Sequence, residues 1–472
     1  IYVCTDSGRE GEYIYRLVEQ QAGVKGKNRR RVWIDSQTEE EILRGIKEAK
    51  DLKEYDNLAA SAYLRAKEDY LMGINFSRLL TLKYGNSISN YLNTKYSVVS
   101  VGRVMTCVLG MVVRREREIR EFVETPFYRV LSTIGEKGAT FEGEWRAVKG
   151  SKWFESFDLY KENGFKEKEK AEELIRYLSN SESDASQPLT CQIVSIEKKK
   201  EKKNPPLLFN LAEIQNECSR RFKISPDETL RIIQELYEKK LVTYPRTDAR
   251  VLSTAVAKEI HKNLNGLMQY EPAKPYLQDI VKFGSHKDLE KTRYVNDKQI
   301  TDHYAIIPTG QGMGALKGLP NLSQRVYDVI VRRFLSIFYP PAVYQKVSIV
   351  TKIKEESFFS SFKVLAEEGY LKVTGVPGRK NDNNDNTDSS ADSTEDKDTD
   401  AAFFARIQSL KKGMTLSVQS LDIKEGKTSP PKRYNSGSMI LAMENAGQLI
   451  EDEELRAQIK GSGIGTSATR AE

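Results

Sequence analysis

The first 124 residues combine a short strand–loop–helix pattern with long amphipathic helices. Ile1–Cys4 has the apolar run of a buried strand, a helix is predicted from Arg9 to Gln20, and a second strand is predicted at Arg31–Asp35. Residues 51–123 place charged residues on one helical face and apolar residues on the other, which indicates amphipathic helices. A strand that leads through a loop into a helix is typical of α/β domains, so we expect residues 1–50 to belong to that class.

Two β-rich stretches lie on either side of a helical one. Aromatic and β-branched residues alternate with polar ones in 125–204 and again in 343–425, which predicts strands. Residues 205–342 have helical periodicity, with capping-box signals at Asn210–Glu213 and Ser225–Glu228 and a strand-like Leu241–Tyr244 after them. We therefore expect a helix-turn-helix or winged-helix unit, inserted into one β layer that both outer stretches build.

Changes of pattern and composition divide the chain into six segments. Their boundaries are expected at 1–50, 51–124, 125–204, 205–342, 343–425 and 426–472. Residues 381–400 have no large apolar side chain and cannot bury enough surface to offset the entropy of ordering them, so we expect a disordered surface loop. Because the chain starts within an apolar strand at Ile1, we also expect it to be part of a longer polypeptide.

Composition excludes several classes of protein. The 472 residues predict about three domains, at roughly 150 residues each. No stretch approaches the roughly 18 consecutive apolar residues of a membrane span, and no G-x-x-x-x-G-K-[ST] motif marks a P-loop ATPase. The four cysteines have neither metal-ligand nor disulfide-scaffold spacing, which fits a reducing cytoplasm; they are Cys4, Cys107, Cys191 and Cys218.

The charge of the chain points to an anionic partner. The chain has 74 Lys and Arg residues against 67 Asp and Glu, a net charge of +7. Residues 381–400 hold eight acidic residues and one lysine, so without their net charge of −7 the rest of the chain carries +14. A net positive charge of this size favours an anionic partner.

A cluster of carboxylates follows the first strand. Asp6 ends the strand, and Glu10 and Glu12 lie in the first turns of the predicted helix. Carboxylates at this edge of a sheet commonly face the ligand in α/β folds, and oxygen ligands without His or Cys favour Mg²⁺. The alternative is that these acidic residues only complement the helix dipole.

Tyr244 stands two residues before Arg246 in the segment Leu241–Arg250. A tyrosine hydroxyl is a weak nucleophile at neutral pH unless a cation or metal stabilises its oxyanion, and arginine is a cation that does not lose its charge. The chain has 23 tyrosines, most of which must be packing residues, so spacing alone does not distinguish Tyr244 from them.

Three further segments combine small polar residues with a basic one. They are Ser100–Thr106 around Arg103, Asp302–Thr309 with His303, and Gly463–Arg470 with Thr466 and Thr469. Backbone amides and hydroxyls next to a cation are a common way to hold phosphate, although a lone histidine is more often structural than catalytic. The run Lys198–Lys203 is expected to be a solvated face or a contact to a phosphate backbone.

Taken together and in this order, these segments resemble the motifs of type IA DNA topoisomerases, and within that family the bacterial topoisomerase III branch. The similar segments are TDSGREGE at 5–12, SVGRVMT at 100–106, LVTYPRTDAR at 241–250, DHYAIIPT at 302–309, KTSPPKRY at 427–434 and GIGTSATRAE at 463–472. The resemblance spans nearly the whole chain apart from the acidic loop.

The resemblance implies a multidomain toroidal fold with α/β, α and β parts. Residues 1–50 would be part of a Toprim domain, and 51–124 with 426–472 would be two parts of a helical domain that binds single-stranded DNA. Residues 125–204 with 343–425 would form a β-rich arch that opens the ring, and 205–342 the winged-helix-like domain that carries the tyrosine.

The resemblance also implies a reaction that needs no ATP. Tyr244 would attack one DNA strand to form a 5′-phosphotyrosine and a free 3′-OH, another strand would pass through the gap, and the break would be religated. The result would be relaxation or decatenation of DNA. Arg246 and His303 would assist at the broken phosphodiester, and the carboxylates of Asp6, Glu10 and Glu12 would hold Mg²⁺.

The implied partner is DNA, preferentially in single-stranded regions, with a helicase as a second candidate partner. The implied DNA contacts are Arg65, Asn75, Ser77, Arg78, Ser100, Arg103, Thr247, Asp248, Thr466, Thr469 and Arg470. We expect a monomer without membrane contact, in the bacterial cytoplasm at the nucleoid.

The sequence departs from the family pattern at three positions. Gly8 replaces the second aspartate of D-x-D-x-E, so metal binding would depend on fewer carboxylates, and the family's catalytic glutamate would precede Ile1. Met105 and Cys107 replace a usual Gln and Pro, which removes a polar DNA contact. Two other functions stay open: a non-catalytic DNA-binding module, and a Toprim nuclease or primase-like enzyme, which would not explain the tyrosine segment.

Overall fold

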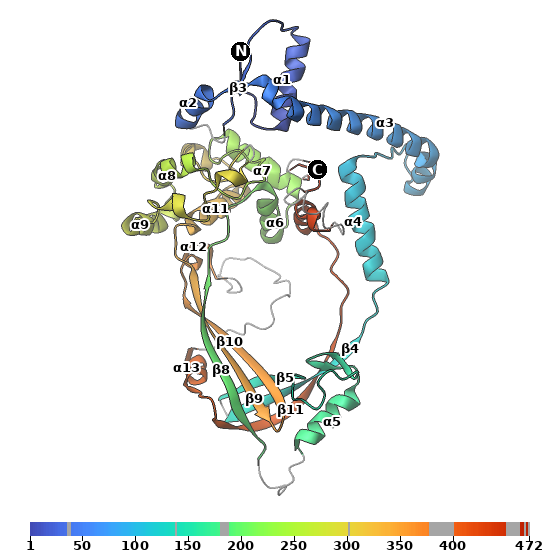
Figure 1. The fold of residues 1–472 in the computed structure, drawn as a ribbon, viewed down its shortest axis with the longest axis vertical. Helices are drawn as coiled ribbons and strands as arrows, with labels where there is room; N and C mark the ends of the chain where they lie inside the picture. The colour runs from blue at the N-terminus through green and yellow to red at the C-terminus, as the bar shows by residue number, and fades with distance from the viewer. Residues whose placement is uncertain are drawn as a thin grey trace.

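The computed structural model describes residues 1–34, 39–136, 139–179, 188–300, 303–376, 401–449, 463–466 and 469–470. The elements are arranged in a ring, which Figure 1 shows face on. The N-terminal unit and the helical unit lie at the top and a β sheet at the bottom; α4 (Arg103–Arg120) descends one side and β8 (Thr190–Lys203) the other. The predicted loop 381–400 lies outside the described residues.

The N-terminal segment is a small α/β unit, as predicted. Its sheet has the order β1 (Tyr2–Val3), β2 (Arg30–Arg31), β3 (Lys50–Asp51), with β1 parallel to β2 and β2 antiparallel to β3. α1 (Arg9–Gln21) follows β1, and α2 (Glu39–Lys47) follows β2. The strand predicted at Arg31–Asp35 is wrong in extent, because the Ile34 amide donates to the Ser7 hydroxyl instead of to a neighbouring strand.

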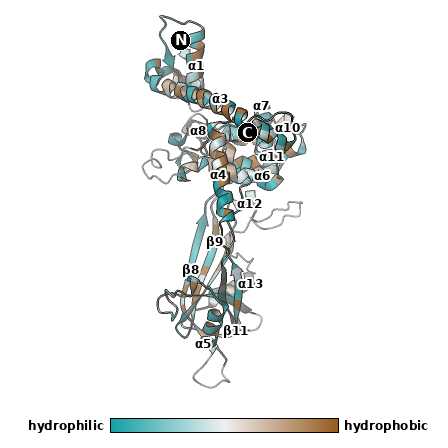
Figure 2. Ribbon diagram, turned by 90° about the vertical axis from the view of Figure 1, so that its right-hand side faces the viewer, coloured by the Kyte–Doolittle hydropathy of each residue, from teal (hydrophilic) through white to brown (hydrophobic). Residues whose placement is uncertain are grey.

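Two long helices lead away from this unit. η1 (Leu52–Tyr55) continues into α3 (Asp56–Leu92), which ends at Asn93 in the left-handed conformation, φ 55°, that commonly terminates helices. The connection to α4 runs back along α3, since the amides of Val99 and Val101 donate to the hydroxyls of Thr81 and Ser77 at 2.9 and 2.8 Å. Apolar side chains stay exposed on α3 and α4, and Figure 2 colours the ribbon brown at the hydrophobic residues of these helices.

The two β-rich stretches form one sheet, as predicted. The remaining strands are β4 (Pro126–Glu136), β5 (Ala139–Arg146), β6 (Leu159–Lys161), β7 (Gly164–Phe165), β9 (Ala342–Ile353), β10 (Glu356–Glu367) and β11 (Thr415–Lys427). They pair in the order β11-β8-β9-β10-β5-β4-β7-β6, and β11 also pairs with β4, so six of the strands close on themselves. The core contains Trp145, stacked on Phe165 and edge-on to Trp153, with the apolar face of α5 (Lys168–Ser179) packed against it.

Residues 205–342 form a helical unit with a core of its own. Its helices are α6 (Leu211–Phe222), α7 (Pro226–Glu238), α8 (Thr254–Leu267), η2 (Glu271–Ala273), α9 (Lys274–Phe283), η3 (Leu289–Lys291), η4 (Asp297–Gln299), α10 (Met313–Leu316) and α11 (Asn321–Ser336). Both predicted helix starts are confirmed, since the side chains of Asn210 and Ser225 cap α6 and α7. The first capping box is half formed, because the Glu213 carboxylate accepts from Arg250 instead.

The strand predicted at Leu241–Tyr244 is only an isolated bridge. Val242 pairs with Pro308, and the Thr243 amide donates to the Ile307 carbonyl at 3.0 Å. Pro245 has no amide proton with which to continue a ladder, so the pairing stops next to Tyr244.

The last elements return the chain to the helical unit. They are α12 (Leu371–Thr374), α13 (Ala401–Ser409), α14 (Ser436–Glu444) and η5 (Ala446–Leu449). α14 packs closely on α6, since a Cβ at Gly437 would lie 2.6 Å from the side-chain oxygen of Asn216. None of the helices in the described ranges has the length and apolar character needed to cross a membrane.

Candidate active site

Tyr244 lies between α7 and α8, half-buried against two aromatic side chains. Its ring centroid is 4.4 Å from that of His303, with the planes tilted by 47°, and 5.4 Å from that of Tyr237, nearly edge-on. The loop is bonded to the segment that carries His303, because the Thr243 hydroxyl donates to the Ala305 carbonyl at 3.0 Å. The Thr247 hydroxyl likewise donates to the His303 carbonyl at 2.7 Å. These bonds hold the tyrosine and the histidine against each other.

Burial and nearby charges act on both side chains. Burial raises the pKa of Tyr244 above its ordinary value, Arg246 lowers it, and Asp6 raises it further. Burial lowers the pKa of His303, whereas Asp6 raises it. Asp6 therefore lies close enough to influence both groups, and the structure brings together three residues predicted from separate motifs.

Arg246 is suited to bind a phosphate beside Tyr244. The side chain is exposed, and no ion pair joins it to another residue in the described ranges. A guanidinium offers two parallel N–H donors to phosphate oxygens and keeps its charge at any physiological pH.

The three acidic residues after β1, Asp6 in the β1–α1 loop and Glu10 and Glu12 in α1, have different surroundings. Asp6 and Glu10 are exposed, and Glu10 lies 3.3 Å from Arg65 of α3. Glu12 is fully buried, with its carboxylate 2.9 Å from the Nε of Arg31 and 2.7 Å from the Nε of Arg16. Glu12 thus differs from Asp6 and Glu10 in being buried between two guanidiniums, whereas the other two predicted metal ligands face solvent.

Arg31 shapes the β1–α1 loop that carries Asp6, and residue type and spacing do not reveal this role. Its guanidinium is fully buried and donates to the backbone carbonyls of Val3, Thr5 and Asp6 at 3.1, 2.7 and 2.5 Å. Gly11 allows α1 to approach this loop, since a Cβ there would lie 2.1 Å from the Asp6 carbonyl oxygen. The path of the backbone at Asp6 thus depends on a residue of β2 and a glycine of α1.

Asp6 and Glu10 make a set of two hard oxygen ligands. In the described part of the chain, no three His, Cys, Asp or Glu side chains gather as a metal cluster. Mg²⁺ fits a pair of carboxylates, because it usually takes one or two and fills its other positions with water and phosphate oxygens.

The predicted DNA contacts on α3 lie on an accessible surface. Asn75 and Arg78 are exposed, whereas the Ser77 hydroxyl is bonded to the Val101 amide and holds the connection that follows α3. Arg65 pairs with Glu10, so it also links α3 to the first turn of α1.

The segment at the start of α4 combines exposure with ion pairing. Ser100 is exposed, and Arg103 makes a two-point ion pair with Asp69 of α3 at 2.5 and 2.8 Å. Because neither partner is buried, the Arg103 guanidinium stays at the surface, where a phosphate can compete with the carboxylate.

The side chains of the predicted contacts at the C-terminal end bond to other groups of the protein. The side chain of Arg470 is only 4% exposed; it donates to the Asp248 carboxylate at 3.1 Å and to the carbonyls of Ile464 and Gly465. Thr466 and Thr469 bond to each other across one turn. Thr247 is buried, and its hydroxyl donates to the His303 carbonyl, which holds the loop against the histidine segment.

Comparison with known proteins identifies the family. The sequence profile described as DNA topoisomerase matches residues 53–472. The chain belongs to the DNA topoisomerase family. The resemblance to type IA enzymes predicted from the motifs is thereby confirmed.

The relatives named DNA topoisomerase 3 are similar over the whole chain. The protein of Bacillus subtilis (strain 168) is 32% identical over 478 residues, and that of Staphylococcus aureus (strain USA300) is 31% identical over 476. All of this chain is matched, and it spans 58% of the length of each relative. The solved structure of full-length topoisomerase I from Thermotoga maritima aligns with a TM-score of 0.60 at 21% identity, covering 99% of this chain and 64% of that one, which supports the ring-shaped fold.

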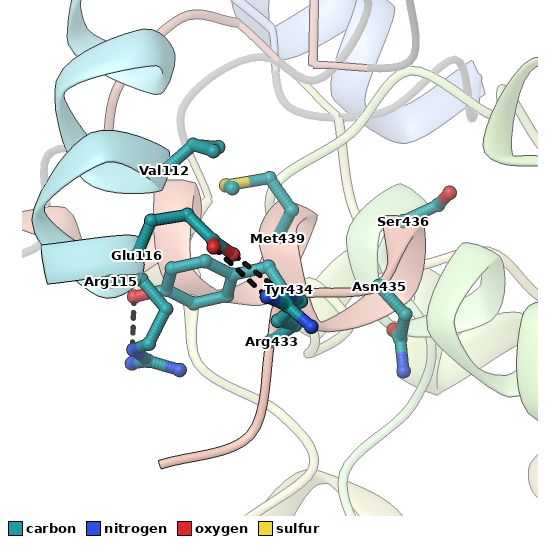
Figure 3. A pocket seen from close by; sticks show the side chains of 8 residues that line it. All are labelled: Val112, Arg115, Glu116, Arg433, Tyr434, Asn435, Ser436 and Met439. Carbon is teal, nitrogen blue, oxygen red and sulfur yellow. Dashed lines mark hydrogen bonds and ion pairs between the residues drawn. The ribbon is translucent and has the colours of Figure 1, made fainter. Parts of the chain in front are cut away.

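One further pocket of this topoisomerase-family chain lies away from Tyr244, where α4 meets the start of α14. It has a volume of about 320 Å³ and is lined by Val112, Arg115, Glu116, Arg433, Tyr434, Asn435, Ser436 and Met439. Figure 3 shows the Glu116 carboxylate facing Arg433 and the Arg115 guanidinium reaching the Tyr434 hydroxyl. These contacts join α4 to the β11–α14 connection, and both lie on the same side of the ring (Figure 1).

Proposed function

We propose that the chain carries the cleavage centre of an ATP-independent type IA topoisomerase. The Tyr244 oxygen attacks a phosphodiester, a bond forms between this oxygen and phosphorus, and the bond from phosphorus to the 3′ oxygen breaks. The products are a 5′-phosphotyrosine and a 3′-OH, which reverses the reaction after another strand has passed. The observation that carries this proposal is the packing of Tyr244 against His303, with the charge of Asp6 acting on the pKa of both.

In this proposal the side chains of the site have separate roles. His303, neutral at pH 7 because burial lowers its pKa, lies against Tyr244 and can take part in moving the phenol proton. Arg246 binds the phosphate and favours the charged phenolate. Asp6 and Glu10 would hold Mg²⁺, which supplies positive charge for the phosphate oxygens when it is bound.

The partner we propose is single-stranded DNA that runs along α3 and the start of α4. Exposed Asn75, Arg78, Ser100 and Arg103 support this path, and the positive charge of the chain outside 381–400 favours it. We further propose that the protein works as a monomer in the bacterial cytoplasm at the nucleoid, with a helicase as an additional partner. A non-catalytic DNA-binding role would leave the meeting of Tyr244 with His303 and Asp6 unexplained.

The test is covalent capture of labelled single-stranded oligonucleotides in denaturant. We expect a 3′ label to become attached to protein and a 5′ label to stay on a free fragment, because the tyrosine takes the 5′ phosphate. Tyr244→Phe is expected to abolish the adduct, whereas Tyr237→Phe, the neighbouring ring, is expected to keep it. An adduct that persists in Tyr244→Phe would exclude this tyrosine as the nucleophile.

A further inference from the structure

The side chain of Asn210 joins three segments of the chain. It is fully buried, and its Oδ1 accepts from the Glu213 amide at 2.9 Å, which caps α6. Its Nδ2 donates to the Asp248 carbonyl at 3.1 Å and to the Glu444 carboxylate at 2.5 Å. Both amide protons and the oxygen are therefore used at once.

Asp248, the first partner of the Asn210 Nδ2, belongs to the loop of Tyr244. Asp248 comes four residues after Tyr244, and between them the Thr247 carbonyl accepts from the Leu211 amide at 3.1 Å. The Thr247 hydroxyl is bonded to His303. The loop is thus held between the start of α6 on one side and the histidine segment on the other.

Glu444, the other partner of the Asn210 Nδ2, belongs to the C-terminal part of the chain. Glu444 ends α14, whose Ile440 and Met443 are buried. A separate contact runs in parallel, since Arg470 donates to the Asp248 carboxylate at 3.1 Å while its other nitrogens donate to the carbonyls of Ile464 and Gly465. Two independent contacts therefore connect the Tyr244 loop with residues after 435.

We propose that Asn210 is a positioning residue for Tyr244: its amide ties the loop that follows the tyrosine to Glu444 of α14, so the tyrosine is placed correctly only when the C-terminal segment is docked. Arg470 and Asp248 form the second tie of the same junction. This assigns Arg470 and Asp248 to an internal contact instead of a DNA contact. The inference concerns how the site of the proposed function is held, and it rests on that function.

Capping alone does not account for this geometry. An aspartate caps a helix about as well as an asparagine, because capping needs only a side-chain oxygen. The two donated hydrogen bonds need an amide. Asn210→Asp therefore keeps the cap, removes both donations and places a carboxylate against Glu444, which isolates the positioning role from helix stability.

The experiment compares Asn210→Asp, Glu444→Gln and the double variant in the full chain. Glu444→Gln keeps an oxygen that accepts from Asn210 and is the matched control, while in the double variant the amide introduced at position 444 can donate to the new carboxylate. We expect Asn210→Asp to lower the saturating rate of oligonucleotide cleavage about 10- to 100-fold, with little change in the half-saturating concentration. The double variant restores a bond to position 444 but not the one to the Asp248 carbonyl, so it is expected to recover only part of this loss.

Hydrogen exchange of the Tyr244 loop gives a second measurement that does not need activity. We expect faster exchange of the amides in 243–249 in Asn210→Asp, with protection only partly regained in the double variant. Wild-type exchange or wild-type cleavage in Asn210→Asp would overturn the positioning role. Absence of a wild-type adduct with altered exchange in Asn210→Asp would instead contradict the proposed function alone.

Discussion

At the scale of single residues, one acidic motif contains carboxylates with opposite roles. Glu10 is exposed beside Arg65, whereas Glu12 is buried between Arg31 and Arg16. Replacing one partner of a buried ion pair leaves an uncompensated charge, which is costly, while an exposed pair contributes little. The two residues are therefore expected to respond differently to the same substitution.

We predict that Glu12→Gln lowers the free energy of unfolding by about 3 kcal/mol, because Arg31 loses its buried counter-charge. Glu10→Gln is expected to change it by less than about 0.5 kcal/mol but to weaken the Mg²⁺ dependence of DNA cleavage. Urea unfolding of both variants measures the change in the free energy of unfolding, and cleavage assays on both measure the change in Mg²⁺ dependence. Equal stability of the two variants would contradict a structural role for Glu12.

The pH profile of cleavage tests the pair Tyr244 and His303. Burial lowers the pKa of His303, so the neutral imidazole persists to a pH below its ordinary value of about 6.5. Burial raises the pKa of Tyr244, so its phenol does not ionise on its own below about 10. We expect a single-turnover rate that is flat from pH 7 to 9 and falls only in acid, with the acid limb lost in His303→Asn. A single-turnover cleavage rate that rises steadily between pH 7 and 9 would contradict this role of the Tyr244 and His303 pair.

The sequence identified the reactive groups but not their supports. Tyr244, Arg246, Asp6 and His303 became candidates through the resemblance of their motifs to one family, since spacing alone does not distinguish Tyr244 from the other tyrosines. The role of Glu12 could not be inferred, because it depends on an arginine in a strand that lies beside the loop only after folding. Asn210 was visible as a helix cap, but a cap signal says nothing about the two further partners of its amide.

At the scale of elements, local patterns predicted helix starts well and strand partners poorly. Asn210 and Ser225 cap their helices as predicted, because capping depends on neighbouring residues only. The closure of the sheet through β11, which pairs with both β8 and β4, depends on contacts between residues far apart in the sequence. Alternation within a strand does not encode its neighbours.

Two glycines in helices are expected to respond oppositely to alanine. Gly110 in α4 has open space around its missing Cβ, so Gly110→Ala is expected to stabilise the protein by roughly 0.5–1 kcal/mol through helix propensity. At Gly11 in α1 the Cβ would lie 2.1 Å from the Asp6 carbonyl oxygen, so Gly11→Ala is expected to destabilise the N-terminal unit and displace Asp6. Thermal unfolding checks both, and stabilisation by Gly11→Ala would contradict the close approach of α1 to the loop.

At the scale of the whole molecule, the ring brings distant segments together and the net positive charge favours the proposed binding of DNA. The N-terminal unit, the helical unit and α14 all lie in the upper part of the ring (Figure 1), and Arg470 donates to Asp248 of the Tyr244 loop. The acidic residues of 381–400 offset half of the positive charge of the rest of the chain.

We predict that neutralising the eight acidic residues of 381–400, at unchanged length, strengthens binding to single-stranded DNA at low salt. The net charge would rise from +7 to +15, and the effect should vanish as salt screens it. Fluorescence titrations between 50 and 500 mM salt, on the order of the range where phosphate contacts weaken, check this. Unchanged affinity at low salt would show that these charges do not act on the DNA site.

The most direct test of the central claim is to locate the nucleotide on the protein. Trypsin is expected to release Leu241–Arg246 as one peptide, since Lys240 and Arg246 bound it. After covalent capture and nuclease digestion, mass spectrometry should find the remaining 5′-phosphorylated nucleotide on Tyr244 within this peptide. A nucleotide on any other residue, or none on the protein under conditions in which DNA is cleaved, would contradict the account.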